Sequence, residues 1–214
     1  MKRRLLLIGG GGHCKSILDS LYNIGDYQEI GIIDKPDNIG NKVLDTTIIG
    51  SDDDLEDLYN SGFTEAFVSV GTIDDFHFKL KIIKKLEKIS FSFPNIIDPS
   101  ATVSEYCKLT KGVFIGKSAI VNANATIGNF AIINSRAICE HDVSVGDCSH
   151  IAPGAIILGN VGIGKKTHIG AGSVIKQGLT IGSETLIGMG SNVVNNIGSH
   201  TIAYGNPCKV VGSL

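Results

Sequence analysis

An aliphatic side chain returns at every sixth position over about half of this chain. Sixteen of the 17 positions in this series are isoleucine, valine or leucine, and the remaining one, a cysteine, is itself a small hydrophobic residue. A helix buries residues at a spacing of 3.6 and an ordinary strand at a spacing of 2, so neither explains a period of six. The period predicts a parallel β-helix in which each unit is one short strand plus a corner. The series consists of Ile97, Val103, Leu109, Ile115, Val121, Ile127, Ile133, Cys139, Val145, Ile151, Ile157, Ile163, Ile169, Ile175, Ile181, Ile187 and Val193.

The residues beside this series agree with a triangular coil. Glycine often follows the aliphatic residue, where a tight corner either leaves no room for a side chain or needs unusual dihedral angles. Four residues after the aliphatic position the side chain is mostly small, as an interior corner requires. Three units close one coil of 18 residues, so the series predicts between five and six coils. The alternative, an irregular glycine-rich sandwich, does not explain the regular spacing.

The repeat resembles that of the hexapeptide-repeat acyltransferases. The resemblance implies a left-handed parallel β-helix, which is an exception to the right-handed rule for crossovers between parallel strands. It is specific for the fold and less specific for the substrate, because the same helix carries many acyl acceptors.

Composition excludes several classes of protein. At 214 residues the chain suits one large or two small domains, and its net charge of −2 comes from mixed charges, so no basic face predicts a nucleic acid partner. The longest apolar run near the start is too short for a membrane span or a signal peptide, so we expect a cytoplasmic protein. Five cysteines without a CxxC pair argue against disulfides and metal sites, and most of them fit as small interior residues.

The six-residue rhythm is absent before Ile97, where strand-like and helix-like segments alternate. This order predicts a small parallel sheet of Rossmann type. Ser51 is expected to cap the second helix. The predicted strands are Arg4–Ile8, Ile30–Ile33 and Ala66–Val70, and the predicted helices are His13–Tyr22, Asp52–Asn60 and Ile73–Ile89.

Four consecutive glycines, from Gly9 to Gly12, follow the first predicted strand and open the first predicted helix. Backbone amides at such a junction can approach a phosphate or a sugar closely. Asp34 ends the second strand, where an acidic residue often accepts a ribose hydroxyl. The dinucleotide fingerprint fails, because Cys14 stands where its third glycine belongs. The pattern favours a mononucleotide or a nucleotide sugar over NAD, with a tight turn that binds nothing as the alternative.

Taken together, the two parts resemble one group of bacterial sugar acetyltransferases, which includes UDP-N-acetylbacillosamine-type N-acetyltransferases and sialic acid O-acetyltransferases. The opening IGGGGH, the strand ends IID and SVG, and PNIIDPSA before the repeats carry this resemblance. It implies that residues 1–92 form a Rossmann-like nucleotide-sugar-binding domain, and that residues 93–214 form the left-handed β-helix acetyltransferase domain with a C-terminal cap. The substrate contacts it implies are Gly11, Gly12, His13, Asp34, Lys35 and Gly71.

His141 lies between two acids, in Glu140-His141-Asp142, at the corner that follows Cys139. A histidine on a rigid coil beside a carboxylate has the fixed position and the acidic partner that a general base needs. An exposed polar corner is the other interpretation of the residues alone. The resemblance implies that His141 accepts the proton of the acceptor and that Asp142 raises its basicity, and the spacing leaves Glu140 open as an alternative partner.

The resemblance further implies direct transfer from acetyl-CoA without a metal ion. The co-substrate contacts it implies are His150, Gly159, Ala171 and Met189. His141 and His150 are nine residues apart, which is half a coil, so they should point from different sides of the prism. The resemblance nevertheless implies that both act at one active site, and that proteins of this fold are usually trimers. We therefore expect a homotrimer whose active sites lie between subunits.

The function predicted from the sequence is acetylation of the amino group of a nucleotide-linked amino sugar, of the UDP-4-amino-sugar type, with His141 as the general base. The first alternative is O-acetylation of sialic acid or a related nonulosonate. A second is covalent catalysis through Cys14 or Cys148. A non-catalytic β-helical binding module is the third, which the acids around His141 argue against. The sequence does not distinguish N-acetylation from O-acetylation and does not identify the sugar.

Overall fold

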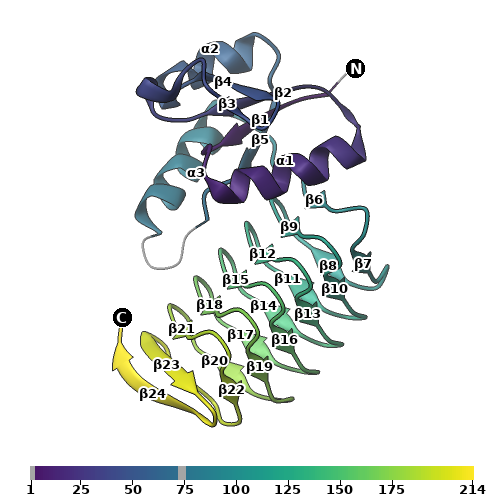
Figure 1. Cartoon of the computed structure of the whole chain (residues 1–214), viewed down its shortest axis with the longest axis vertical. Coiled ribbons are helices and arrows are strands. Elements are labelled where there is room, and N and C mark those ends of the chain that lie inside the picture. The colour runs from purple at the N-terminus through teal and green to yellow at the C-terminus, as the bar shows by residue number, and fades with distance from the viewer. Residues whose placement is uncertain (1–2, 72–75) are drawn as a thin grey trace. The chain divides into compact units, whose positions relative to one another are not determined.

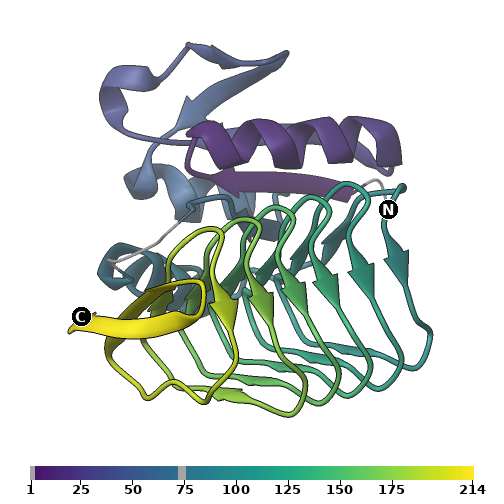
Figure 2. The ribbon, with the colours of Figure 1, turned by 60° about the horizontal axis from the view of Figure 1, so that its bottom comes forward.

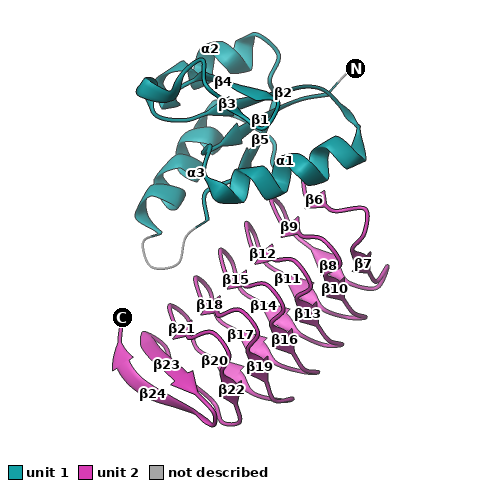
Figure 3. Ribbon diagram, in the orientation of Figure 1, with its two compact units in different colours: residues 1–94 teal, residues 95–214 magenta. Residues whose placement is uncertain are grey.

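The structure, a computed structural model, describes residues 3–71 and 76–214. The chain divides into two compact units, residues 1–94 and 95–214 (Figure 3). Each unit has its own sheets and its own buried residues.

The first unit is a five-stranded sheet in the order β3-β4-β2-β1-β5 with helices between the strands (Figure 1). The pairs β1–β2, β1–β5 and β2–β4 are parallel, and β3–β4 is antiparallel. Successive residues Leu5, Leu6 and Leu7 are all fully buried, as expected for a parallel strand covered on both faces. The elements are β1 (Arg3–Ile8), α1 (Gly12–Ile24), β2 (Tyr27–Ile33), η1 (Pro36–Asn38), β3 (Lys42–Val43), β4 (Thr46–Gly50), η2 (Asp52–Asp54), α2 (Leu55–Asn60), β5 (Glu65–Val68) and α3 (His77–Ile89).

The predicted alternation of strands and helices is present, and the structure differs from the prediction in detail. The hairpin of β3 and β4 was not predicted, because two and five residues are too few for a period to be visible. The predicted helix Asp52–Asn60 is a 3₁₀ turn followed by α2, and its predicted cap is confirmed, since Ser51 accepts a hydrogen bond from the Asp53 amide. The first residues of the predicted helix Ile73–Ile89, residues 73–75, lie outside the described residues.

The second unit is a left-handed parallel β-helix, which confirms the predicted fold (Figure 2). Each coil contributes one two-residue strand to each of three sheets, here called the first, second and third face. The first face contains β6 (Ile96–Ile97), β9 (Phe114–Ile115), β12 (Ile132–Ile133), β15 (His150–Ile151), β18 (His168–Ile169) and β21 (Leu186–Ile187). The second contains β7 (Thr102–Val103), β10 (Ile120–Val121), β13 (Ile138–Cys139), β16 (Ile156–Ile157), β19 (Val174–Ile175) and β22 (Asn192–Val193). The third contains β8 (Lys108–Leu109), β11 (Thr126–Ile127), β14 (Ser144–Val145), β17 (Gly162–Ile163) and β20 (Thr180–Ile181).

The periodic aliphatic residue is the second residue of each strand and fills the core of the prism. The first residue of each strand faces outward, and the three faces differ in what they present there. The second face presents a half-buried aliphatic column, whereas the third presents polar side chains and one glycine. The aliphatic column consists of Ile120, Ile138, Ile156 and Val174.

Most corners of the β-helix have a constrained position, and many have two. A Cβ atom on Gly146 would lie 2.6 Å from the Lys165 amide nitrogen of the next coil, and one on Gly164 would lie 2.4 Å from the Ser183 amide nitrogen. These glycines are therefore needed for close approach between coils. The unusual dihedral angles occur two residues later in the corner, where Asp142, for example, has a φ of 62°.

A C-terminal hairpin closes the β-helix. β23 (Thr201–Gly205) pairs parallel with β21, and β24 (Cys208–Ser213) pairs antiparallel with β23 at the end of the first face. The sheet therefore ends in a strand that runs against the direction of all the coils.

Candidate functional site

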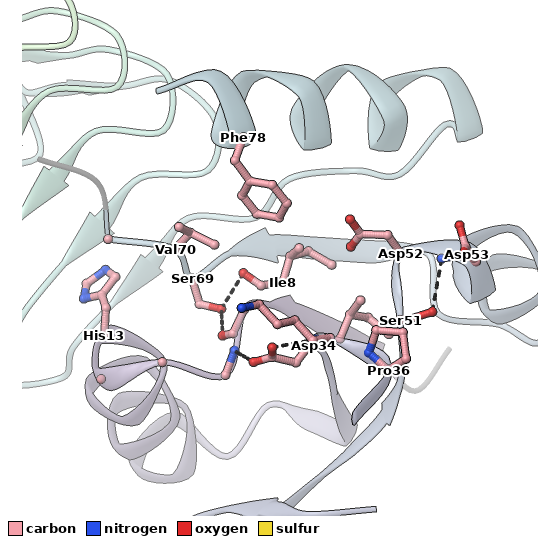
Figure 4. A pocket seen from close by; sticks show the side chains of 17 residues that line it. Ile8, His13, Asp34, Pro36, Ser51, Asp52, Asp53, Ser69, Val70 and Phe78 are labelled. Carbon is pink, nitrogen blue, oxygen red and sulfur yellow. Dashed lines mark hydrogen bonds between the residues drawn. The ribbon is translucent and has the colours of Figure 1, made fainter. Parts of the chain in front are cut away.

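A cavity of about 550 Å³ lies in the first unit at the ends of β1, β2 and β5 (Figure 4). All six residues predicted to bind the substrate line this one cavity. They come from the three segments that follow β1, β2 and β5, which the parallel sheet brings together at the carboxyl ends of its strands. The six residues are Gly11, Gly12, His13, Asp34, Lys35 and Gly71.

The glycine turn of this cavity is fixed by a carboxylate. The amide of Gly10 donates to Oδ2 of Asp34 at 2.6 Å, and the amide of Lys35 donates to Oδ1 at 2.7 Å. A Cβ atom on Gly10 would lie 2.6 Å from the same Oδ2, so no other residue fits there without displacing the carboxylate. Burial alone would raise the pKa of Asp34, but the hydrogen bonds from Lys35, Gly10 and Asn38 outweigh it and hold the pKa below its usual value.

Helix α1 begins at the cavity and presents its N-terminal amides to it. Gly11 is the N-cap residue and no acidic side chain occupies the first turn, so the positive end of this 13-residue helix is not neutralised from within. Burial, together with the nearby charge of Lys79, lowers the pKa of His13 to about 4. A neutral imidazole and a helix N-terminus thus face the same space.

Sequence reasoning missed three contributors to this cavity. The Ser69 hydroxyl lies 2.7 Å from the carbonyl oxygen of Gly9 and ties β5 to the glycine turn. The ring of Phe78 points into the cavity from α3, and the carboxylate of Asp52 lies at the end away from His13 (Figure 4). Asp52 could have been predicted from the sequence, because it directly follows the capping residue Ser51. Phe78 could not, because in the sequence it looks like any residue that packs a helix onto a sheet.

In the second unit, His141 stands at the corner between the second and third faces. Its Nδ1 lies 2.8 Å from Oδ2 of Asp142, and the imidazole side chain is 64% exposed. An ionised carboxylate only accepts hydrogen bonds, so the proton of this pair sits on Nδ1 and leaves Nε2 as the basic nitrogen. Hydrogen bonds from Asn124 and from His141 lower the pKa of Asp142, which keeps this carboxylate ionised.

The geometry distinguishes the two acids beside His141. Glu140 accepts a hydrogen bond from Nδ2 of Asn122 at 2.9 Å, and in the described part of the chain no hydrogen bond joins it to the imidazole. The carboxylate partner of His141 is therefore Asp142. The alternative that the spacing left open, Glu140, lies next to His141 without a hydrogen bond to its ring.

A second cavity opens around His141, and Gly159 of the next coil forms its floor. A Cβ atom on Gly159 would lie 2.6 Å from Cε1 and 2.7 Å from Nε2 of His141. The imidazole consequently lies over a backbone without a side chain. Gly159 therefore lies at the same site as His141 and its partner Asp142.

The other three residues predicted to bind acetyl-CoA lie elsewhere on the prism. His150 is on the first face, where its Nε2 lies 3.0 Å from Nδ2 of Asn134 and its ring meets that of His168 edge to face at 4.9 Å. Ala171 and Met189 follow β18 and β21 at the corner between the first and second faces, and Met189 is 82% exposed. One chain therefore brings Gly159 to His141 but leaves His150, Ala171 and Met189 on a different side.

Comparisons with known proteins show which family this chain resembles over most of its length. The PglD N-terminal domain family matches residues 4–86. The structure of PerB from Caulobacter crescentus, in complex with CoA and GDP-perosamine, is 34% identical, with a TM-score of 0.90 over 97% of each chain. The acetyltransferase domain of PglB from Neisseria gonorrhoeae FA1090, in complex with acetyl coenzyme A, is 30% identical, with a TM-score of 0.91 over 99% of this chain and 100% of that domain. The chain belongs to the hexapeptide-repeat sugar acetyltransferases.

A third structure extends this comparison. It is a variant of the GDP-perosamine N-acetyltransferase of Caulobacter crescentus in which a histidine is replaced by alanine, solved with CoA and GDP-perosamine. It is 33% identical, with a TM-score of 0.91 over 98% of this chain and 97% of that chain. A search of curated protein sequences gave no match.

Membership of the sugar acetyltransferases makes this protein an enzyme, an acyltransferase. Cys14 is not suited to covalent catalysis, because burial raises its pKa to about 11 and leaves it protonated at neutral pH. Within residues 3–71 and 76–214, no group of three histidine, cysteine or acidic side chains is arranged to hold a metal ion. The helices of the same ranges are all too short or too polar to cross a bilayer.

Proposed function

We propose that this sugar acetyltransferase transfers an acetyl group from acetyl-CoA to the amino group of a nucleotide-linked amino sugar of the UDP-4-amino-sugar type. The observation that carries the proposal is the hydrogen bond of 2.8 Å between His141 and Asp142 in an open cavity. It supports a base with one ring nitrogen anchored by a carboxylate and the other beside an open cavity. The relatives were solved with CoA or acetyl coenzyme A, and two of the structures with GDP-perosamine, so a GDP-linked sugar is the first variant to compare.

His141 acts as the general base in this proposal. Nε2 takes a proton from the amine as the nitrogen attacks the thioester carbonyl, and Asp142 stabilises the imidazolium that forms. The carbonyl oxygen becomes an oxyanion that a backbone N–H stabilises, and the thiolate of CoA leaves without needing an acid. General base catalysis of this kind contributes roughly 10²–10⁴-fold to the rate.

The first unit holds the nucleotide end of the acceptor. The diphosphate binds at the N-terminus of α1, where the amides of Gly11 and Gly12 and the helix dipole favour a negative charge. His13 is uncharged at neutral pH, so it serves as a hydrogen-bonding partner for a sugar or phosphate oxygen and does not act as a counter-ion. Asp34 and Lys35 flank the nucleoside.

The active site forms between subunits of a homotrimer. His141 stands at the corner opposite the first face, which carries His150, so the two belong to one site only if neighbouring copies supply them. The aliphatic column of the second face, which includes Ile138 and Ile156, is the surface we expect a neighbouring copy to cover. CoA then lies between Gly159 of one copy and His150, Ala171 and Met189 of the next.

Mixing two inactive variants tests this arrangement. His141→Ala and His150→Ala chains are unfolded, mixed in equal amounts and refolded together. If sites lie between subunits, about a quarter of the sites in random trimers combine an intact His141 with an intact His150, and activity returns to that fraction. Sites contained within one chain would stay inactive in every mixture.

An acceptor screen tests the function itself. UDP-, GDP- and CMP-linked sugars with amino or hydroxyl acceptors are incubated with acetyl-CoA, and the release of free thiol is followed. Thiol release with an amino sugar supports the proposal, and acetylation of a nonulosonate would replace it by O-acetylation of sialic acid. A protein that binds no acetyl-CoA in calorimetry would be a binding module and not this enzyme.

A further inference from the structure

Two asparagines of the preceding coil hold the two acids beside His141. Asn122 donates to Glu140 at 2.9 Å, and Asn124 donates to Oδ1 of Asp142 at 2.6 Å. Each pair is 18 residues apart, so each asparagine lies directly one coil before its acid. The two bonds are chemically alike, but only the carboxylate held by Asn124 reaches the imidazole.

The backbone at Asn124 and Asp142 suits this pairing. Both residues adopt the left-handed conformation, with φ of 60° and 62°, which asparagine, aspartate and glycine tolerate better than other residues. With one carboxylate oxygen held by the Asn124 amide, the other is directed at Nδ1 of His141. The hydrogen bond from Asn124 is also the largest influence that lowers the pKa of Asp142.

We propose that Asn124 is a positioning residue, which fixes the Asp142 carboxylate so that the proton of His141 stays on Nδ1 and Nε2 remains the basic nitrogen. The inference rests on the proposed role of His141 as the general base. Asn124 itself is not among the residues that line the cavity around His141. It acts through Asp142, in the way that groups behind a ligand histidine set its tautomer and orientation.

Asn124→Asp tests the hydrogen bond with almost no change of shape. When both groups are ionised, the new carboxylate repels that of Asp142 and donates no hydrogen bond to it, while the left-handed backbone is retained. In ¹⁵N-histidine NMR of the full-length protein, we expect His141 to move from the Nδ1–H to the Nε2–H tautomer, with its signal assigned by loss in His141→Asn. We expect kcat to fall roughly 10–100-fold, with KM for the nucleotide sugar within about twofold of wild type.

Asn122→Asp is the matched control, because it makes the same change beside Glu140. We expect the His141 tautomer to stay as in the wild type. A wild-type tautomer in Asn124→Asp, or an equal shift in both variants, would overturn the role of Asn124. Should Asn124→Asp fail to fold, Asn124→Gly removes the amide at a backbone position that favours glycine, and the same shift is expected. A fully active His141→Asn enzyme would instead remove the proposed function, while the tautomer measurement still decides the role of Asn124.

Discussion

Each unit of the molecule holds an aspartate whose pKa is lowered, and the two carboxylates have different partners. Asp34 accepts hydrogen bonds mainly from backbone amides, those of Gly10 and Lys35. Asp142 accepts them from the side chains of Asn124 and His141. The first carboxylate therefore determines the shape of a loop, and the second determines the orientation and proton of one imidazole. Changes at the first should alter binding, and changes at the second should alter turnover.

The largest expected effect is a loss of turnover without a loss of nucleotide-sugar binding. His141→Ala should lower kcat by roughly 10²–10⁴-fold, because the base is lost while the cavity of the first unit is untouched. Steady-state kinetics measure the loss, and calorimetry should give a Kd for the nucleotide sugar within about twofold of wild type. A variant whose kcat stays within about tenfold of wild type would remove His141 from the mechanism.

Gly159→Ala should have the next largest effect. Its Cβ would overlap the His141 ring, so the ring must move by about an ångström, and such displacements cost on the order of 10²-fold in kcat. Gly162→Ala is the matched control, because its Cβ would meet nothing closer than Thr180 Oγ1 at 4.0 Å. Equal activity in the two variants would show that the placement of the ring over Gly159 is not required.

Asp34→Asn should produce the opposite pattern. The amide keeps the size of the side chain but loses the negative charge that holds the Gly10 amide, so the glycine turn loosens. We expect Kd for the nucleotide sugar to rise about tenfold, and kcat at saturation to change by less than about twofold. If kcat fell and Kd stayed constant, the division of tasks between the two units would be wrong.

Acid stability should show the smallest effect. Because the folded pKa of Asp34 lies below its ordinary value of 3.8, its stabilising contribution is present above that pH and is lost as the pH falls through the folded pKa. Asp34→Asn should therefore lower the Tm at pH 6 by less than about 4 °C, and the difference should shrink as the pH falls below 3.8. Calorimetric scans at pH 6 and at successively lower pH values measure it. A difference that grew towards low pH would contradict the direction of the pKa shift.

The sequence predicted the β-helix because its period of six has one structural explanation, and the period also placed His141 at an outward corner. The substrate-binding residues predicted from the family resemblance all line the cavity of the first unit. Asn122 and Asn124 were missed although they stand one coil of 18 residues before Glu140 and Asp142, so the repeat itself contained the signal. The ring of Phe78 carried no such signal, because its place in the cavity depends on how α3 packs.

The hairpin of β23 and β24 has a consequence for assembly. A stack of identical coils has no fixed length, because its last coil would present the same unpaired amide and carbonyl groups as any coil before it. Reversal of the final strand ends that template, since an incoming copy would need a partner of matching polarity. Truncation before Thr201 should therefore expose the parallel edge of β21 and favour association of copies through that edge.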